Sequence, residues 1–221
     1  MERVPEPELM VHQSQVAAYA NGDFSIPHNA FVEQFVRYFP DVRSDVAGRC
    51  LDIGAGPCDI TVRMARRFPQ MVFTALDGSK GMLEAAKDRL AKEKLQDRVS
   101  LLQTRLPSSV PKGPYDFIIS NSLLHHLHEP DVLWQSIIDA GHSGTKVLVM
   151  DLFRASSLED AREKTQKYCA HEPKVLQEDF YNSLCAAFSL EEVFAMIKNH
   201  HLKGLRVETI SDRHLVVYGE L

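Results

Sequence analysis

The chain has 221 residues, of which 44% are hydrophobic and 25% charged, and its formal net charge is −5. This length suits one domain with a sizeable core, and the acidic balance argues against a nucleic-acid-binding surface. No apolar run approaches the roughly 20 residues of a membrane span, and the N-terminus lacks the apolar core of a signal peptide.

The four cysteines are scattered, without Cys-x-x-Cys spacing; they are Cys50, Cys58, Cys169 and Cys185. We expect them to be reduced thiols, with no disulfide framework and no zinc site. This usage predicts a cytoplasmic protein. The oligomeric state cannot be inferred from the sequence.

Two helices are expected before the first strand. The first covers residues 9–20, and a break follows at Asn21-Gly22-Asp23. The second carries Phe31, Phe35 and Phe39 on one face, which predicts packing on a sheet.

Residues 49–59 predict the opening of a βαβ unit. The apolar run 50–53 ends at Gly54 and Gly56, and an amphipathic helical pattern follows. Glycine permits both the sharp turn and the close approach of a ligand. A second apolar run, 71–76, ends in Asp77, where a carboxylate at a strand tip can accept bonds from two ribose hydroxyls.

Acidic residues around this turn separate two ligand classes. Asp59 stands at the third glycine position of a dinucleotide fingerprint, where it would repel a pyrophosphate, and Asp52 lies just upstream. Carboxylates suit a ligand with an ammonium and a sulfonium. The stretch resembles motif I of class I S-adenosylmethionine-dependent methyltransferases at Asp52, Gly54 and Gly56, with Cys58 where the third glycine usually stands.

The next segment, Asp77-Gly78-Ser79-Lys80-Gly81-Met82-Leu83, resembles motif II of methyltransferases related to the ubiquinone and menaquinone C-methylating enzymes. There the methionine packs on the adenine ring, which is Met82 here, although Met82 could also be a core residue. Ser79 is the expected N-cap of the following helix. The resemblance also implies an N-terminal lid over the cofactor in residues 1–45, with Tyr19 and Phe24 as lid candidates, each as easily a packing residue.

A third strand is expected over 99–103. The family usually follows it with an aspartate for the adenine amino group, but this chain has Thr104, Arg105 and Leu106 there, so that contact is either missing or made by the backbone. The resemblance therefore implies cofactor contacts from these residues: Asp52, Gly54, Gly56, Asp77, Gly78, Met82, Arg105, Leu106, Asn121 and Tyr19.

The fourth strand, 115–121, has the unbroken apolar centre of a buried parallel strand and ends at Asn121. The segment after it resembles the Leu-His-His-Leu of small-molecule methyltransferases, and not the motif that grips a planar amine. At most one of His125 and His126 is expected to face the acceptor and bond or deprotonate it, while the other packs or caps the helix; His126 is favoured by the resemblance. A helix-capping imidazole is the alternative for each.

A metal site is not expected at these histidines. Three histidines within four residues, His125, His126 and His128, cannot all face one ion on a strand-to-helix turn, and no acidic cluster accompanies them in the sequence.

Pro130 opens the next expected helix, and the fifth strand covers 145–151. Two further helices, 157–169 and 173–187, exceed a simple crossover. We interpret 155–188 as an inserted helical cap over the site, with an ornamental helix pair as the alternative. Tyr181 in the cap is a candidate catalytic residue. Ser189 and Glu192 predict a capping box for the last helix.

The chain closes with two strands, 205–210 and 214–218, joined by a tight turn that makes them antiparallel. We therefore expect an α/β, Rossmann-like, seven-stranded, mostly parallel sheet with an antiparallel C-terminal hairpin, as in class I methyltransferases. The whole chain, 1–221, is predicted to be one such domain.

The function predicted by the resemblance is methyl transfer from S-adenosylmethionine, which leaves S-adenosylhomocysteine, to an O, N, S or C nucleophile of a small molecule. The expected partner is thus a small-molecule substrate, with neither nucleic acid nor membrane. A non-catalytic cofactor-binding protein and an NAD-dependent oxidoreductase are the alternatives. A metal-dependent catechol methyltransferase ranks low. Such an enzyme is expected to have acidic ligands after both strands four and five, and only Asp151 is present.

Overall fold

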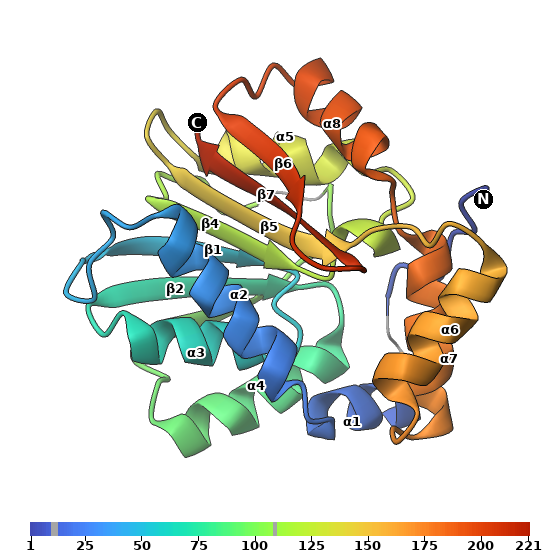
Figure 1. Cartoon of the computed structure of the whole chain (residues 1–221). Coiled ribbons are helices and arrows are strands. Elements are labelled where there is room, and N and C mark those ends of the chain that lie inside the picture. The colour runs from blue at the N-terminus through green and yellow to red at the C-terminus, as the bar shows by residue number, and fades with distance from the viewer. Residues whose placement is uncertain (10–12, 108–109) are drawn as a thin grey trace.

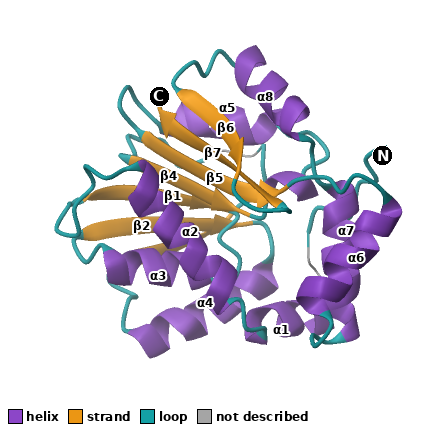
Figure 2. Ribbon diagram, viewed as in Figure 1, coloured by secondary structure: helices purple, strands orange, loops and turns teal. Residues whose placement is uncertain are grey.

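The computed structural model describes residues 1–9, 13–107 and 110–221. Its centre is a seven-stranded sheet in the order β3-β2-β1-β4-β5-β7-β6 (Figures 1 and 2). The strands are β1 (Gly48–Ile53), β2 (Met71–Asp77), β3 (Val99–Gln103), β4 (Phe117–Asn121), β5 (Lys146–Leu152), β6 (Leu205–Thr209) and β7 (His214–Glu220).

Strands β1 to β5 pair in parallel, whereas β7 pairs antiparallel with both β5 and β6. The predicted sheet and its C-terminal hairpin are thereby confirmed. The strand order reverses beside β1, between β2 and β4. Ligands of open α/β sheets bind at such a switch point, beyond the carboxyl ends of the strands.

Helices cover both faces of the sheet (Figure 1). The described helices are α1 (Gln13–Asn21), α2 (Ser25–Tyr38), α3 (Asp59–Arg67), α4 (Lys80–Glu93), the short 3₁₀ helix η1 (Leu124–His126), α5 (Asp131–Ala140), α6 (Leu158–Cys169), α7 (Lys174–Ala186) and α8 (Leu190–Asn199). Residues 10–12 of the first expected helix lie outside the described part. Among the described helices, none combines the length and apolarity that a membrane span requires.

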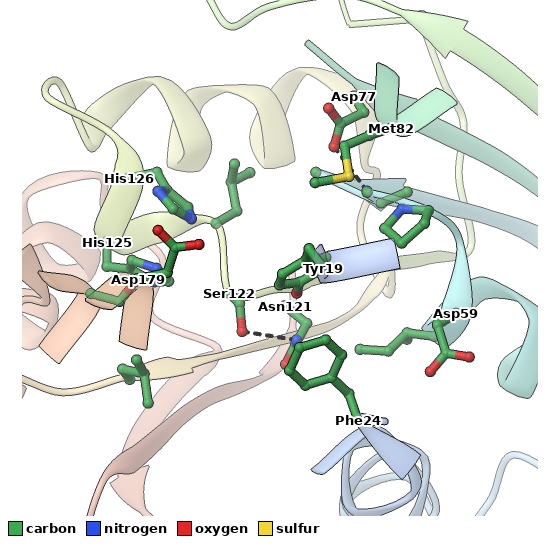
Figure 3. A pocket seen from close by; sticks show the side chains of 18 of the residues that line it. Tyr19, Phe24, Asp59, Asp77, Met82, Asn121, Ser122, His125, His126 and Asp179 are labelled. Carbon is green, nitrogen blue, oxygen red and sulfur yellow. Dashed lines mark hydrogen bonds between the residues drawn. The ribbon is translucent and has the colours of Figure 1, made fainter. Parts of the chain in front are cut away.

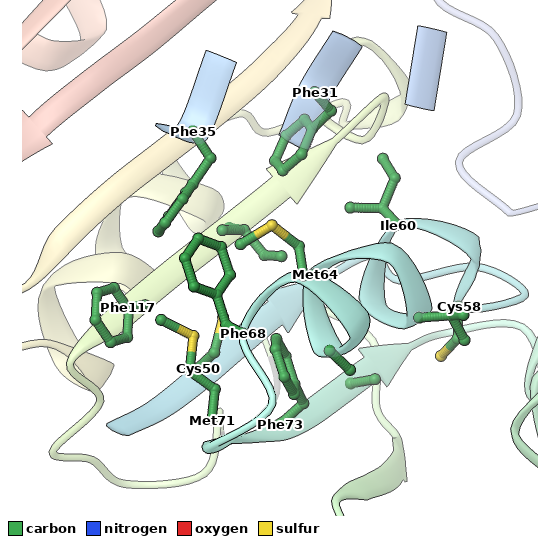
Figure 4. Close-up of a cluster of buried hydrophobic side chains, with 14 of the residues drawn as sticks. Phe31, Phe35, Cys50, Cys58, Ile60, Met64, Phe68, Met71, Phe73 and Phe117 are labelled. Atoms are coloured by element: carbon green, nitrogen blue, oxygen red, sulfur yellow. The ribbon is translucent and has the colours of Figure 1, made fainter. Parts of the chain in front are cut away.

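Each face has its own buried core because alternate strand residues point to opposite sides. Cys50 of β1 packs with α2 and α3 on one face (Figure 4). Its neighbour Leu51 packs with α5 and α8 on the other. Phe31 and Phe35 of α2 are fully buried in the first core, which confirms their predicted packing on the sheet.

The cap helices α6 and α7 lie beyond the carboxyl ends of the strands, away from both faces (Figure 1). Ser157 caps α6, and Ser189 and Glu192 form the predicted capping box of α8. Residues 1–9, which we call the N-terminal strap, contain neither helix nor strand. The strap runs beside the cap: the Val4 N–H donates to the Cys185 carbonyl at 3.0 Å.

Candidate functional site

A cavity of about 620 Å³ lies where the strand ends, the lid and the cap meet. Its walls come from the turn after β1, the ends of β2 and β4, helix α1, the loop before α2, and α7 (Figure 3). All ten predicted cofactor residues line it: Asp52, Gly54, Gly56, Asp77, Gly78, Met82, Arg105, Leu106, Asn121 and Tyr19.

The turn after β1 has the left-handed backbone that favours glycine, with φ of 75° at Gly54 and 52° at Gly56. A Cβ at Gly56 would meet no atom of the described residues within 4 Å, whereas one at Gly54 would lie 2.9 Å from the Leu123 side chain. Gly56 therefore keeps the cavity open, and Gly54 makes room for Leu123.

Cys58 stands where the resemblance to motif I placed the third glycine, and it adopts a backbone conformation that favours glycine. It precedes α3 with φ of 60°, a left-handed conformation that costs a non-glycine residue about 1–2 kcal/mol. Its side chain is fully buried. The departure from the family pattern is thus accommodated by strain and packing, and the turn keeps its shape.

Asp77 joins the second strand to the glycine turn. Its Oδ2 accepts from the Gly56 N–H at 2.8 Å and its Oδ1 from the Ser79 N–H at 2.7 Å. Burial raises the pKa of Asp77, although these two backbone bonds oppose the shift. Each oxygen keeps a second lone pair, so the carboxylate can still receive ribose hydroxyls.

Asp52 lies deeper, at 3% exposure. Burial raises the pKa of this carboxyl to about 7, despite a hydrogen bond from the Thr61 hydroxyl at 2.5 Å. A positively charged ligand group nearby would favour its ionised form.

Asp59 is not free to repel an anion, which corrects the argument made from the sequence. Its carboxylate pairs with His28 of α2, with Arg63 Nε at 3.1 Å and with Arg89 Nη1 at 2.7 Å. Burial acts against ionisation, but the hydrogen bonds and charge interactions with His28 and Arg63 prevail and lower the pKa of Asp59 to about 2. Arg89 also donates to the Ala20 carbonyl at 3.0 Å, so Asp59 ties the lid helices to the core.

Aromatic rings from α1 and from the loop before α2 line this end of the cavity. The rings of Tyr19 and Phe24 lie 4.8 Å apart, and both line the cavity with Met82 (Figure 3). Burial, reinforced by nearby carboxylates, raises the pKa of Tyr19 to about 12. Leu9 of the strap lies over Gly78, since a Cβ there would come 2.7 Å from Leu9 Cδ2.

The two histidines after β4 both line the cavity. His125 Nδ1 lies 2.5 Å from Asp151 Oδ1, and both side chains are almost fully buried. The Asp151 carboxylate raises the pKa of His125 against the opposing effect of burial. His126 is slightly more exposed and lies beside Glu6, its Nδ1 3.1 Å from Glu6 Oε1. His128 is more than half exposed and takes no part in this group.

Glu6 is the site residue that sequence reasoning missed. It comes from the strap, where Ser183 of α7 donates to its Oε1 at 3.0 Å. The paired residues Glu6 and His126 are 120 residues apart in sequence, and the segment around Glu6 has no periodic pattern. Its only signal is the run of acids alternating with prolines, Pro5-Glu6-Pro7-Glu8.

Tyr181 is not among the cavity-lining residues, so its predicted place at the site is not supported. It packs instead in a small third core with Leu152 and Leu184. The face of α7 that meets the cavity consists of Leu176, Asp179, Phe180 and Ser183. Their i, i+3, i+4, i+7 spacing is the signal that could have identified this face.

The fold is similar to that of solved methyltransferases. The plantazolicin methyltransferase BpumL in complex with SAH superposes with a TM-score of 0.73 over 94% of this chain and 89% of its own, at 14% identity. A SAM-dependent methyltransferase from Aquifex aeolicus covers 95% of this chain and 98% of its own, with a TM-score of 0.65 and 16% identity. Residues 51–144 match the family model described as "Methyltransferase domain".

Curated relatives match one half of the chain. Malonyl-[acyl-carrier protein] O-methyltransferase of Priestia megaterium is 32% identical over 111 residues, 50% of this chain and 37% of the relative. Trans-aconitate 2-methyltransferase of Mycobacterium ulcerans is 31% identical over 119 residues, 51% of this chain and 42% of the relative. The matched segment thus spans less than half the length of these relatives.

Proposed function

We propose that this chain binds S-adenosylmethionine and transfers its methyl group to a small-molecule acceptor. One observation carries the proposal: Gly56, Asp77 and Met82 share a single cavity with His126 and Asp179. The first three suit the nucleoside of a cofactor, and the last two can bind an acceptor. We also propose that the chain is one methyltransferase domain. In this domain residues 1–45 would form a lid over the cofactor and residues 155–188 a cap over the acceptor.

The cofactor end is proposed to work by binding and orientation. Asp77 would hold the ribose, Met82 and the lid aromatics would enclose the adenine, and Asp52 would attract the ammonium group. The sulfonium already makes the methyl group electrophilic, so the protein need only align an acceptor with it and exclude water.

At the acceptor end, His126 is proposed to bond or deprotonate the nucleophile, with Glu6 orienting its ring. Asp179 of α7 adds a carboxylate on the same side. The motif II resemblance to ubiquinone and menaquinone C-methylating enzymes and the relatives acting on trans-aconitate and malonyl-[acyl-carrier protein] support a small organic acceptor. We propose that nucleic acid is not a partner of this protein.

Isothermal titration with S-adenosylhomocysteine and with NAD tests the cofactor. Saturable binding of the former alone is expected, and the reverse preference would support the oxidoreductase alternative. Turnover with radiolabelled S-adenosylmethionine over a panel of small acids, phenols, amines and thiols tests the reaction. Cofactor binding without turnover on any acceptor would favour a non-catalytic binding protein.

A further inference from the structure

We infer that Glu6, His125 and His126 form a binding site for a divalent transition-metal ion of the zinc class. One ligand atom from each residue lies within 4.8 Å of the other two. The sequence argument against a metal had two grounds: three neighbouring histidines cannot all face one ion, and no acidic cluster accompanies them. The group proposed here uses two of the histidines and takes its carboxylate from the strap. Two imidazole nitrogens and one carboxylate oxygen favour zinc, iron, cobalt or nickel over magnesium or calcium.

The distances suit a shared ion. Glu6 Oε1 lies 3.5 Å from His125 Nε2 and 3.1 Å from His126 Nδ1. Ligands at about 2.0–2.2 Å from a tetrahedral zinc ion are separated by roughly 3.3–3.6 Å. The first separation lies within this range and the second is slightly shorter, while the two ring nitrogens are within 4.8 Å of each other. Rotations of the three side chains would therefore bring the three atoms around one ion.

The atoms behind the ligands are arranged as in known metal sites. The Nδ1 of His125 faces Asp151, so its Nε2 is the nitrogen available to an ion. A carboxylate behind a ligating imidazole fixes the ring and raises its basicity. Asp151 is itself held by the Leu152 N–H at 2.7 Å, and Glu6 by the Ser183 hydroxyl.

Two buried atoms at this place lack hydrogen-bond partners among the described residues. One is His126 Nδ1, which lies near Glu6 without forming a hydrogen bond of acceptable geometry, and the other is Asp179 Oδ2. Figure 3 shows the Asp179 carboxylate directed into the cavity near the two rings. Buried polar atoms without partners are rare and call for an unseen ion or water.

The local charge also favours a cation. The carboxylates of Glu6, Asp151 and Asp179 face the group, whereas Arg3 is the nearby guanidinium. Arg3 donates to the backbone carbonyl oxygens of Ala186, His125 and Leu127, and not to the side chains of the three ligands. A divalent ion would therefore offset a surplus of negative charge.

Three protein ligands would leave an open coordination position, as in catalytic zinc sites. Because both histidines line the cavity, that position would face the acceptor end and take a carboxylate, phenolate or enolate oxygen. This choice of acceptor class rests on the proposed methyl transfer, whereas binding of the ion does not.

The test uses the full chain without a polyhistidine tag. Titration with Co²⁺ is followed by visible absorption, and Zn²⁺ is then added as competitor. We expect the protein to bind one equivalent of Co²⁺ and to show the intense absorption bands of a four- or five-coordinate ion. Addition of Zn²⁺ should displace the Co²⁺ and remove these bands. Glu6→Gln and His126→Asn should each weaken binding at least tenfold. His142→Asn, at an exposed histidine outside the cavity, should leave it unchanged.

S-adenosylhomocysteine affinity and thermal unfolding are measured on the same proteins. If the folded wild type takes up no Co²⁺, or if Glu6→Gln and His126→Asn bind it as wild type does, the metal site is refuted and the three residues form only an ion-paired network. Cofactor binding intact in that case leaves the proposed function standing, so the two failures are distinguishable.

Discussion

The backbone N–H of Gly56 donates to Asp77 Oδ2 at 2.8 Å, so one carboxylate both closes the glycine turn and faces the cavity. The turn and the tip of β2 are thereby a single unit. A ligand that bonds Asp77 meets a loop already held in place, which lowers the entropy cost of binding.

Asp77→Ala should weaken S-adenosylhomocysteine binding by about 1.5–3 kcal/mol for each charge-assisted bond lost, or at least tenfold. Isothermal titration calorimetry of each variant with S-adenosylhomocysteine measures this change in affinity. Asp45→Ala, at an exposed aspartate of the loop before β1, is the control. Equal affinities in Asp77→Ala and wild type would refute the assignment of β2 to the ribose.

Gly56→Ala should lower cofactor affinity by roughly tenfold, or about 1.4 kcal/mol, because the new methyl group enters the open cavity. Gly144→Ala is a matched control: its φ is 92°, and a Cβ there also meets nothing within 4 Å among the described residues. Both variants should lose about 1–2 kcal/mol of stability to backbone strain. An affinity loss shared by both variants would mean that strain, and not the cavity, is responsible.

Asp59→Asn should destabilise the fold at pH 7 by about 2 kcal/mol, since the pKa of Asp59 falls from 3.8 to about 2 on folding. A lowered carboxyl pKa stabilises the folded state above the unfolded value. That contribution is lost as the pH falls from about 4 through 2. Urea unfolding at pH 7 and pH 3 should therefore show a smaller difference from wild type at pH 3. A difference independent of pH would show that the ion pairs contribute nothing.

Asp179→Asn should reduce methyl transfer about tenfold, the effect of roughly 1.4 kcal/mol in the barrier, and leave S-adenosylhomocysteine affinity unchanged. Glu178→Gln is the control, because its side chain is exposed on the same helix and does not line the cavity. Single-turnover assays with an identified acceptor separate the two effects. If Asp179→Asn transfers the methyl group at the wild-type rate, α7 does not hold the acceptor.

The fold could be predicted because its signals are local. The apolar run before Gly54, the stripe at Phe31 and Phe35, and the turn before β7 each depend on neighbours in sequence. The cavity wall proposed to hold the cofactor could be predicted for the same reason, since Asp77 and Met82 belong to one short sequence motif. Their positions relative to the turn are fixed by the βαβ connection.

The acceptor wall could not be predicted equally well. Glu6 reaches the histidines across the whole first half of the chain, and no short-range pattern records such a contact. Tyr181 was chosen for its chemistry, but a step of one residue turns a helix by about 100°, and its neighbour Phe180 faces the cavity instead. The charge of Asp59 is compensated by Arg89, 30 residues away in sequence, and no short-range pattern records that pair.

The N-terminal strap touches both ends of the cavity. Leu9 lies over Gly78 and Glu8 pairs with Arg105 at the proposed cofactor end, while Glu6 meets His126 at the proposed acceptor end. A ligand that displaces or fixes the strap at one end must then change the free energy of binding at the other. By thermodynamic linkage the effect is reciprocal, so the cofactor and the acceptor should alter each other's affinity by the same factor.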